Sequence, residues 1–179
     1  MFRFASLLAA AALLGAARQD EMVDNSEYKA WAKLKPGAWV KWNLETNMGA
    51  MKMQQVMTLK LKEVTAERVV LDQVITIDMG GKPQDQVTPR AIPAKIAKGT
   101  NSEGAKVEEI AKGEEELEVK GVKYKCPWVE MKITGKQGGT IRTWRNDQVI
   151  GGALKTVIKH DEAAKMTMTM TVTDWKDKE

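Results

Sequence analysis

Hydrophobic and polar residues alternate along most of this chain, and the alternation predicts β-strands. It is clearest in residues 40–48, 51–61, 69–79 and 165–173, where nearly every second residue is apolar. Side chains two positions apart on a strand share one face, so this period is typical of antiparallel strands with one buried face. The short connections at Gly49-Ala50 and at 65–67 favour a meander of neighbouring strands.

One helix is predicted before these strands, over residues 24–34. Asn25 or Ser26 can cap its first turn, and Trp31 belongs to its apolar face. Pro36-Gly37 follows and favours a turn, because proline and glycine disrupt a continuing helix.

The alternation is lost between Gly80 and Gly104, a segment that contains Pro83, Pro89 and Pro93. Proline has no backbone N–H and cannot donate to a sheet. We therefore expect a long irregular crossing here, with a short strand or turn near residues 91–96.

The second half of the chain returns to strands. Lys120-Gly121 predicts a tight hairpin turn between a strand that ends at Val119 and one that starts at Val122. Beyond Pro127 the apolar residues change parity, which predicts a bulge or an edge position at this proline. Further strands are expected in 141–145 and 153–160.

These elements predict a single, mainly β domain over residues 18–179. We expect about eight strands in a strongly curved antiparallel sheet, half-barrel or barrel-like, with a short N-terminal helix.

Residues 1–17 are expected to be a signal peptide. Arg3 precedes an apolar stretch over 5–14, and Gly15-Ala16-Ala17 offers small residues for a peptidase. Cleavage after Ala17 would leave 162 of the 179 residues and, without Arg3, lower the net charge from +4 to +3. We expect an exported protein, in a periplasm or outside the cell, without a membrane span. Both phenylalanines would be removed, so tryptophan and methionine would fill the core.

The composition argues against most catalytic chemistry. The chain has one histidine and one cysteine, which excludes most histidine-based catalytic and zinc sites and any disulfide within the chain. Lysines alternate with acidic residues and do not form a basic cluster with aromatic residues, so a nucleic-acid partner is not expected. We expect a non-enzymatic protein with no cofactor. Cys126 shares the parity of Tyr124 and is interpreted as a buried structural thiol.

Two candidate sites follow from the large apolar residues. The first is an apolar ligand-binding face. Its candidate residues are Trp42, Met53, Met57, Tyr124 and Trp144.

The second candidate site is a copper site. Met166, Met168 and Met170 share one strand face, and His160 has a parity that allows it to join them. Thioether and imidazole groups are soft ligands that suit Cu(I). The alternative is that these methionines simply fill a core without phenylalanine, and this alternative is favoured.

Three segments resemble a known group of proteins. They are residues 31–40, residues 116–126, and Thr143-Trp144 followed by residues 149–152. Together they are similar to periplasmic half-barrel proteins related to lipoprotein carriers. That resemblance implies a curved antiparallel sheet wrapped around a helix, with an apolar concave face. This chain departs from it in having a single short helix.

The leading hypothesis is an exported binding protein that holds an apolar ligand, a lipid or a lipoprotein on a concave sheet face. A methionine-rich copper-binding protein is the second hypothesis. An envelope structural or interaction protein without a small ligand is the third.

Overall fold

The computed structural model of the protein describes residues 21–78, 83–101, 105–134, 138–160 and 166–177. The proposed signal peptide lies outside these residues. The described part contains one short helix and eleven strands. In chain order they are β1 (Met22–Asp24), α1 (Ser26–Ala32), β2 (Trp39–Met48), β3 (Met51–Val64), β4 (Arg68–Asp78), β5 (Pro83–Pro93), β6 (Lys95–Ala97), β7 (Lys106–Val119), β8 (Val122–Thr134), β9 (Gly139–Arg145), β10 (Ala153–His160) and β11 (Met166–Lys176).

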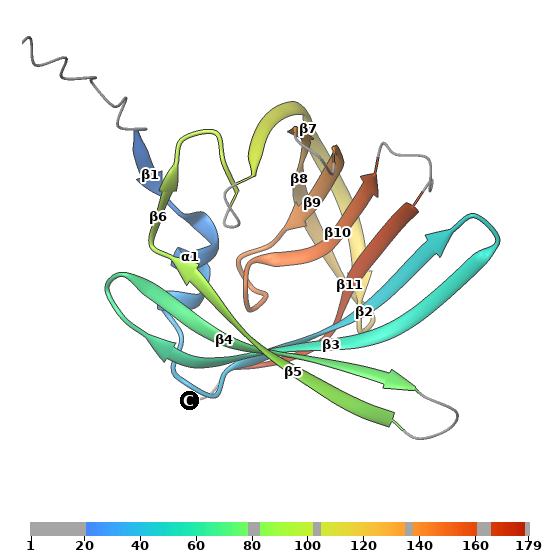
Figure 1. Ribbon diagram of the computed structural model, residues 1–179, viewed down its shortest axis with the longest axis horizontal. Helices are drawn as coiled ribbons and strands as arrows, with labels where there is room; N and C mark the ends of the chain where they lie inside the picture. The colour runs from blue at the N-terminus through green and yellow to red at the C-terminus, as the bar shows by residue number, and fades with distance from the viewer. Residues whose placement is uncertain (1–20, 79–82, 102–104, 135–137, 161–165, 178–179) are drawn as a thin grey trace, which may run out of the picture.

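Nine of the strands form one antiparallel sheet in the order β5-β4-β3-β2-β11-β10-β9-β8-β7. Each strand pairs with its neighbours in the chain, except that β11 returns to pair with β2 in the middle of the sheet. Figure 1 shows the sheet curving strongly, so that β2–β5 cross beneath β7–β10. The short strands β1 and β6 form a separate pair. The predicted curved, mainly β fold with a short N-terminal helix is confirmed.

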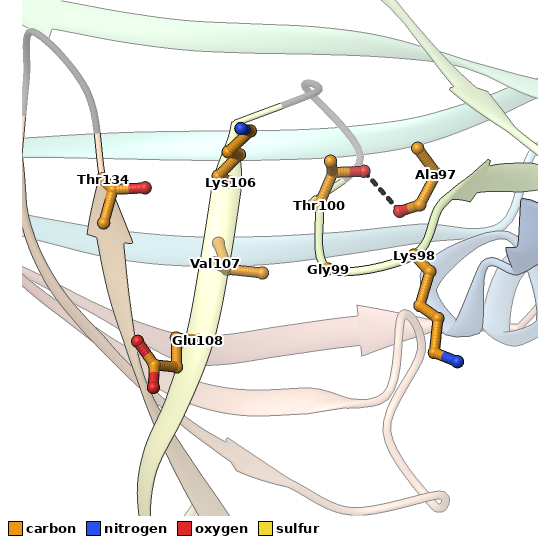
Figure 2. Close-up of a pocket in the computed structure, with 8 residues that line it drawn as sticks. All are labelled: Ala97, Lys98, Gly99, Thr100, Lys106, Val107, Glu108 and Thr134. Carbon is orange, nitrogen blue, oxygen red and sulfur yellow. Dashed lines mark hydrogen bonds between the residues drawn. The ribbon is translucent and has the colours of Figure 1, made fainter. Parts of the chain in front are cut away.

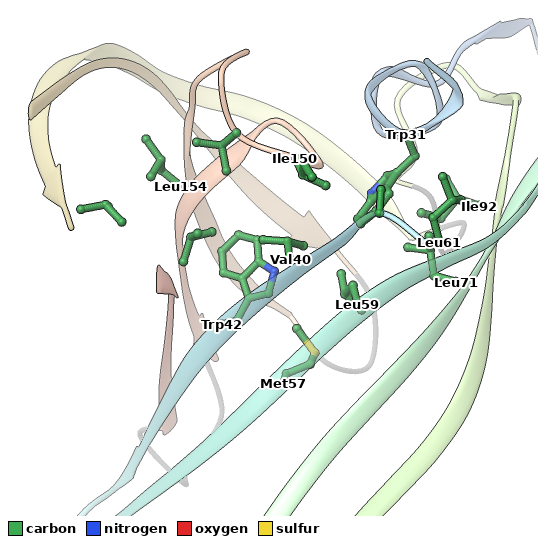
Figure 3. Packing of buried hydrophobic residues seen from close by; sticks show 14 of the residues in the cluster. Trp31, Val40, Trp42, Met57, Leu59, Leu61, Leu71, Ile92, Ile150 and Leu154 are labelled. Atoms are coloured by element: carbon green, nitrogen blue, oxygen red, sulfur yellow. The ribbon is translucent and has the colours of Figure 1, made fainter. Parts of the chain in front are cut away.

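The helix α1 fills one end of the concave side. Asn25 caps it by accepting a 3.0 Å hydrogen bond from the Glu27 backbone N–H, and its own amide donates to the Pro93 carbonyl at 2.8 Å. Tyr28 anchors the helix to the sheet by donating to the Thr65 carbonyl at 2.7 Å. Trp31 is buried among the core residues of β3, β4 and β5 (Figure 3). The concave side is therefore closed at the end where the helix lies.

The irregular crossing expected over residues 80–104 is wrong for its described part. Residues 83–93 form the edge strand β5, which pairs with β4 from Asp78↔Pro83 to Arg68↔Pro93. Proline is tolerated there because an edge strand has one side with no partner to receive its N–H groups. The described strands also exceed the expected eight: β1 and β5 were not foreseen, whereas β6 lies where a short strand or turn was expected near residues 91–96.

The structure tests the predicted hairpin turn at Lys120-Gly121 and the bulge or edge position predicted at Pro127. Lys120 and Gly121 both have positive φ, 54° and 76°, as a tight hairpin turn requires. Pro127 pairs with Glu114 of β7 without a bulge, and the pairing of β8 with β9 starts only at Trp128, so of the two alternatives predicted for this proline the edge position is the one found. The β7–β8 register shifts instead between Glu109 and Ala111.

The turn end of the β7–β8 hairpin contacts the C-terminal end of β11, although β9 and β10 lie between them in the sheet order. Lys120 forms an ion pair with Asp174 and lies 5.3 Å from the ring centroid of Trp175. Tyr124 meets Trp175 edge-on, with ring centroids 6.5 Å apart. These contacts hold the curved sheet together at this end. Among the described residues, no helix is long and apolar enough to cross a bilayer.

Candidate apolar site on the concave face

A continuous row of mostly apolar side chains crosses six neighbouring strands on the concave face. Residues that pair across antiparallel strands point to the same side of a sheet. The row follows from five successive cross-strand pairs. Its members, from β3 to β8, are Met53, Thr46, Met168, Ile158, Ile141 and Met131.

Burial along this face decreases from the helix end toward the opposite end. Trp42 is only 5% exposed, and its partners across β3 and β11, Met57 and Val172, are also buried. Toward the other end, Met53 in the row is 45% exposed and Met51 is 63% exposed. The concave face therefore has a filled end under the helix and an open, methionine-rich end. We call the row together with Trp42, Leu44, Met48, Met51 and Met166 the methionine face.

Trp42 contains a buried donor without an acceptor. Among the described residues, its Nε1 is the one buried side-chain nitrogen or oxygen with no hydrogen-bond partner. Its neighbours on the sheet are Val40, Leu44, Met57 and Val172, all apolar. In Figure 3 the indole lies inside the concave core, with its nitrogen on the side of the ring that faces Leu59 and Met57.

The structure brings together three of the five residues predicted to bind an apolar ligand. Trp42 pairs with Met57, and Met53 pairs with Thr46 on the same face. Their parity was evident from the sequence. Ile141, Ile158 and Met131 extend this face but were missed, because strand order and register are needed to connect them.

Trp144 lies on the opposite face of the sheet. It pairs with Lys155, which pairs with Thr171, the neighbour of the concave residue Val172. The Trp144 Nε1 donates a 2.7 Å hydrogen bond to the Glu115 carboxylate, and Lys155 lies 4.9 Å from its ring centroid. Trp144 is 4% exposed and belongs to the buried hydrophobic cluster, with Glu115 and Lys155 as its polar neighbours.

Tyr124 follows the parity of Trp128 on β8. Its ring packs against Trp175, which pairs with Val40 on the face of Trp42, and Tyr124 packs against the buried cluster that contains Trp42 and Trp144. A ligand-binding role for Tyr124 and Trp144 stays a prediction.

The four residues of the candidate copper site share the concave face. Met168 pairs with Ile158 and Met170 with Thr156, and His160 lies two residues beyond Ile158 on β10. Met166 pairs with Met48, which in turn pairs with Met51. All four candidate ligands are half-buried. Because residues two apart on a strand are separated by about 7 Å, Met166 and Met170 lie about 13 Å apart along β11.

Cys126 is a buried free thiol, in agreement with the sequence interpretation. Its Sγ lies 3.4 Å from the Tyr124 carbonyl oxygen. Burial raises the pKa of the thiol, and the nearby Glu115 carboxylate raises it further. A raised pKa leaves less of the reactive thiolate at neutral pH.

Two cavities lie away from the methionine face. One, of about 270 Å³, lies between the segment 97–100 and the strands β7 and β8 (Figure 2). The other, of about 200 Å³, lies on the face of Trp144, beside Arg142 and Lys159. Both are smaller than the roughly 300–1,000 Å³ of typical enclosed ligand pockets.

No protein-family model matches the chain, and no curated protein matches it. Several solved structures are similar to it. A protein with a YmcC-like fold from Bacteroides fragilis has a TM-score of 0.44 and 10% identity, over 80% of this chain and 97% of that one. A LolA superfamily protein from Nitrosomonas europaea has a TM-score of 0.33 and 7% identity, over 88% of this chain and 94% of that one. A domain from Vibrio parahaemolyticus assigned to outer membrane lipoprotein sorting has a TM-score of 0.33 and 10% identity, over 85% of this chain and 89% of that one.

A LolA superfamily protein and a lipoprotein-sorting domain are thus among the solved structures to which this chain is similar. At these identities and TM-scores, no residue role is carried over from them to this chain.

Proposed function

We propose that this protein is a non-enzymatic, exported binding protein that holds an apolar ligand, such as the acyl chain of a lipid or lipoprotein, on the methionine face. The observation that carries the proposal is the row from Met53 to Met131 across six strands. Met53 is 45% exposed and four other members of the row are half-buried, so part of this apolar row reaches solvent, and exposed apolar patches often mark binding sites.

Methionine suits such a face. Its unbranched, flexible side chain adapts to ligands of irregular shape, and its burial by a ligand is favourable. Covering apolar surface contributes roughly 25 cal/mol per Å². The exposed Met51 and Met53 at the open end offer the largest gain. Export is supported by Arg3 and the apolar stretch over 5–14.

The dimensions of the face support an acyl chain. Met48 lies six positions after Trp42 on β2, which corresponds to roughly 20 Å at the rise of a strand. One acyl chain spans about half of the ~30 Å hydrocarbon core of a bilayer. The face is therefore long enough for one such chain to lie along the strands from the filled end to the open end.

Mass spectrometry of the protein purified from its exported fraction without detergent tests the proposal. We expect a lipid or another long-chain molecule to be released on denaturation and to be reduced in a variant with Met168→Lys. Release of a protein partner without any long-chain molecule would favour an envelope interaction protein instead.

Copper binding is a second candidate, supported by the shared face of Met166, Met168, Met170 and His160. Soft thioether and imidazole groups favour Cu(I). Titration with Cu(I) under reducing conditions tests it. Binding that is lost when the three methionines of β11 are replaced by leucine would support the site, and an unchanged titration would rule it out.

A further inference from the structure

The unpartnered donor of Trp42 gives the apolar site a chemical preference. We infer that the methionine face takes a long-chain ligand with a small, uncharged oxygen acceptor at its buried end, and that this acceptor binds the Nε1 of Trp42. The inference rests on the proposed function and specifies the class of ligand.

The first step is the cost of the free donor. Trp42 is 5% exposed, and its Nε1 has no acceptor in the described structure. Buried polar groups are nearly always hydrogen-bonded, and an unsatisfied one destabilises the fold by about 1–3 kcal/mol. A phenylalanine at this position would avoid that cost. Because the described residues supply no acceptor, we expect a bound ligand to supply it.

The second step is the position of Trp42 relative to the open end. Trp42 lies on the same strand face as Leu44, Thr46 and Met48, which lead to the exposed Met51. A chain inserted along these residues from the open end reaches Trp42 last. Its entering end must displace flexible side chains such as Met57 and Met170, which adapt more readily than branched ones.

The third step is the charge of the acceptor. The sheet neighbours of Trp42 are apolar and uncharged, with Met57 on β3 and Val172 on β11. A carboxylate buried beside them would lack a cation, which is strongly unfavourable. An ester, an alcohol or a protonated acid carries an acceptor without this cost. The buried end is therefore a neutral oxygen.

Two uncharged probes of similar size, methyl octanoate and decane, test the inference. Each is measured by its displacement of N-phenyl-1-naphthylamine from the wild type and from the Trp42→Phe variant. The readout is the ratio of ester affinity to alkane affinity. We expect the substitution to lower this ratio about 3- to 10-fold, the size of one net hydrogen bond. Trp39→Phe is the matched control and should leave the ratio unchanged, because Trp39 lies on the opposite face of β2 and pairs with Lys60 and Lys176.

The outcomes separate the inference from the proposed function. If both probes bind and Trp42→Phe leaves the ratio unchanged, the inference is overturned and the apolar site stands. If neither the dye nor the probes bind, the proposed function fails and the inference fails with it. If Trp42→Phe does not fold, the test uses the wild type instead and follows the indole N–H resonance of Trp42 by NMR as each probe is added. A downfield shift with the ester but not with the alkane supports the inference, and no shift overturns it.

Discussion

The indole nitrogen of Trp144 donates a 2.7 Å hydrogen bond to Glu115, whereas the indole nitrogen of the equally buried Trp42 has no partner. Replacing either residue with phenylalanine removes similar buried volume, but only Trp144→Phe removes a hydrogen bond. We expect Trp144→Phe to lower the free energy of unfolding by about 1–3 kcal/mol more than Trp42→Phe. Urea unfolding followed by circular dichroism measures both. A larger loss for Trp42→Phe would contradict the hydrogen-bond assignment.

Gly113 leaves room for the ring of Trp128. A methyl group at this glycine would lie 2.7 Å from the Trp128 Cζ2 atom. The ring cannot move freely, because the Arg142 guanidinium lies 4.3 Å from its centroid and is paired with Glu130. We expect Gly113→Ala to destabilise the protein by about 1–3 kcal/mol. Thermal unfolding of the single variants and of the double variant with Trp128→Leu tests this. The cost of Gly113→Ala should shrink when Trp128 is absent, and an unchanged cost would assign it to the backbone instead.

Asn25 joins the helix to the edge strand through both ends of its amide. Its oxygen caps α1, and its nitrogen donates to the Pro93 carbonyl at 2.8 Å. We expect Asn25→Ala to cost about 1–3 kcal/mol, because the residue is buried and both bonds are lost. Asn25→Ser retains a capping oxygen and should cost less. Equal losses in chemical unfolding would show that the cap contributes nothing.

The Lys120–Asp174 ion pair should make the free energy of unfolding depend on pH in the acidic range. The hydrogen bond from Lys120 lowers the pKa of the Asp174 carboxyl below its ordinary value of about 3.9. A lowered folded-state pKa stabilises the protein above the unfolded pKa, and this contribution is lost as the pH falls through the folded pKa. The stability difference between wild type and Asp174→Asn should therefore be constant near neutral pH and disappear below pH ~4. A difference that persists in strong acid would exclude this charge as its source.

Cys126 should react slowly while the protein is folded. Its side chain is fully buried, and its pKa is raised by that burial and by Glu115. We expect a thiol reagent such as dithionitrobenzoate to label it only on unfolding. Labelling of the native protein at the rate of a free cysteine would show that this part of the sheet opens readily.

The strands of the sheet's centre were predictable from the sequence, but its edges were not. In β2, and in β3 from Met57 to Leu61, buried residues alternate with less buried ones, and in β11 methionine and threonine alternate although both are half-buried. The edge strand β5 is exposed on most of its residues and contains three prolines, which hides its period. The candidate site shows the same limit. Parity groups Trp42 with Met57, but only the register links Met168 to Ile158 and places Trp144 on the other face.

Binding of N-phenyl-1-naphthylamine to two neighbouring lysine variants of β11 tests the central claim most directly. Met168 lies on the methionine face, whereas Thr169 pairs with Glu45 and Val157 on the opposite face. With both variants folded by circular dichroism, we predict that Met168→Lys weakens dye binding by at least about tenfold. Thr169→Lys should bind like the wild type. Equal binding by the two variants, or a greater loss from Thr169→Lys, would contradict an apolar site on the concave face.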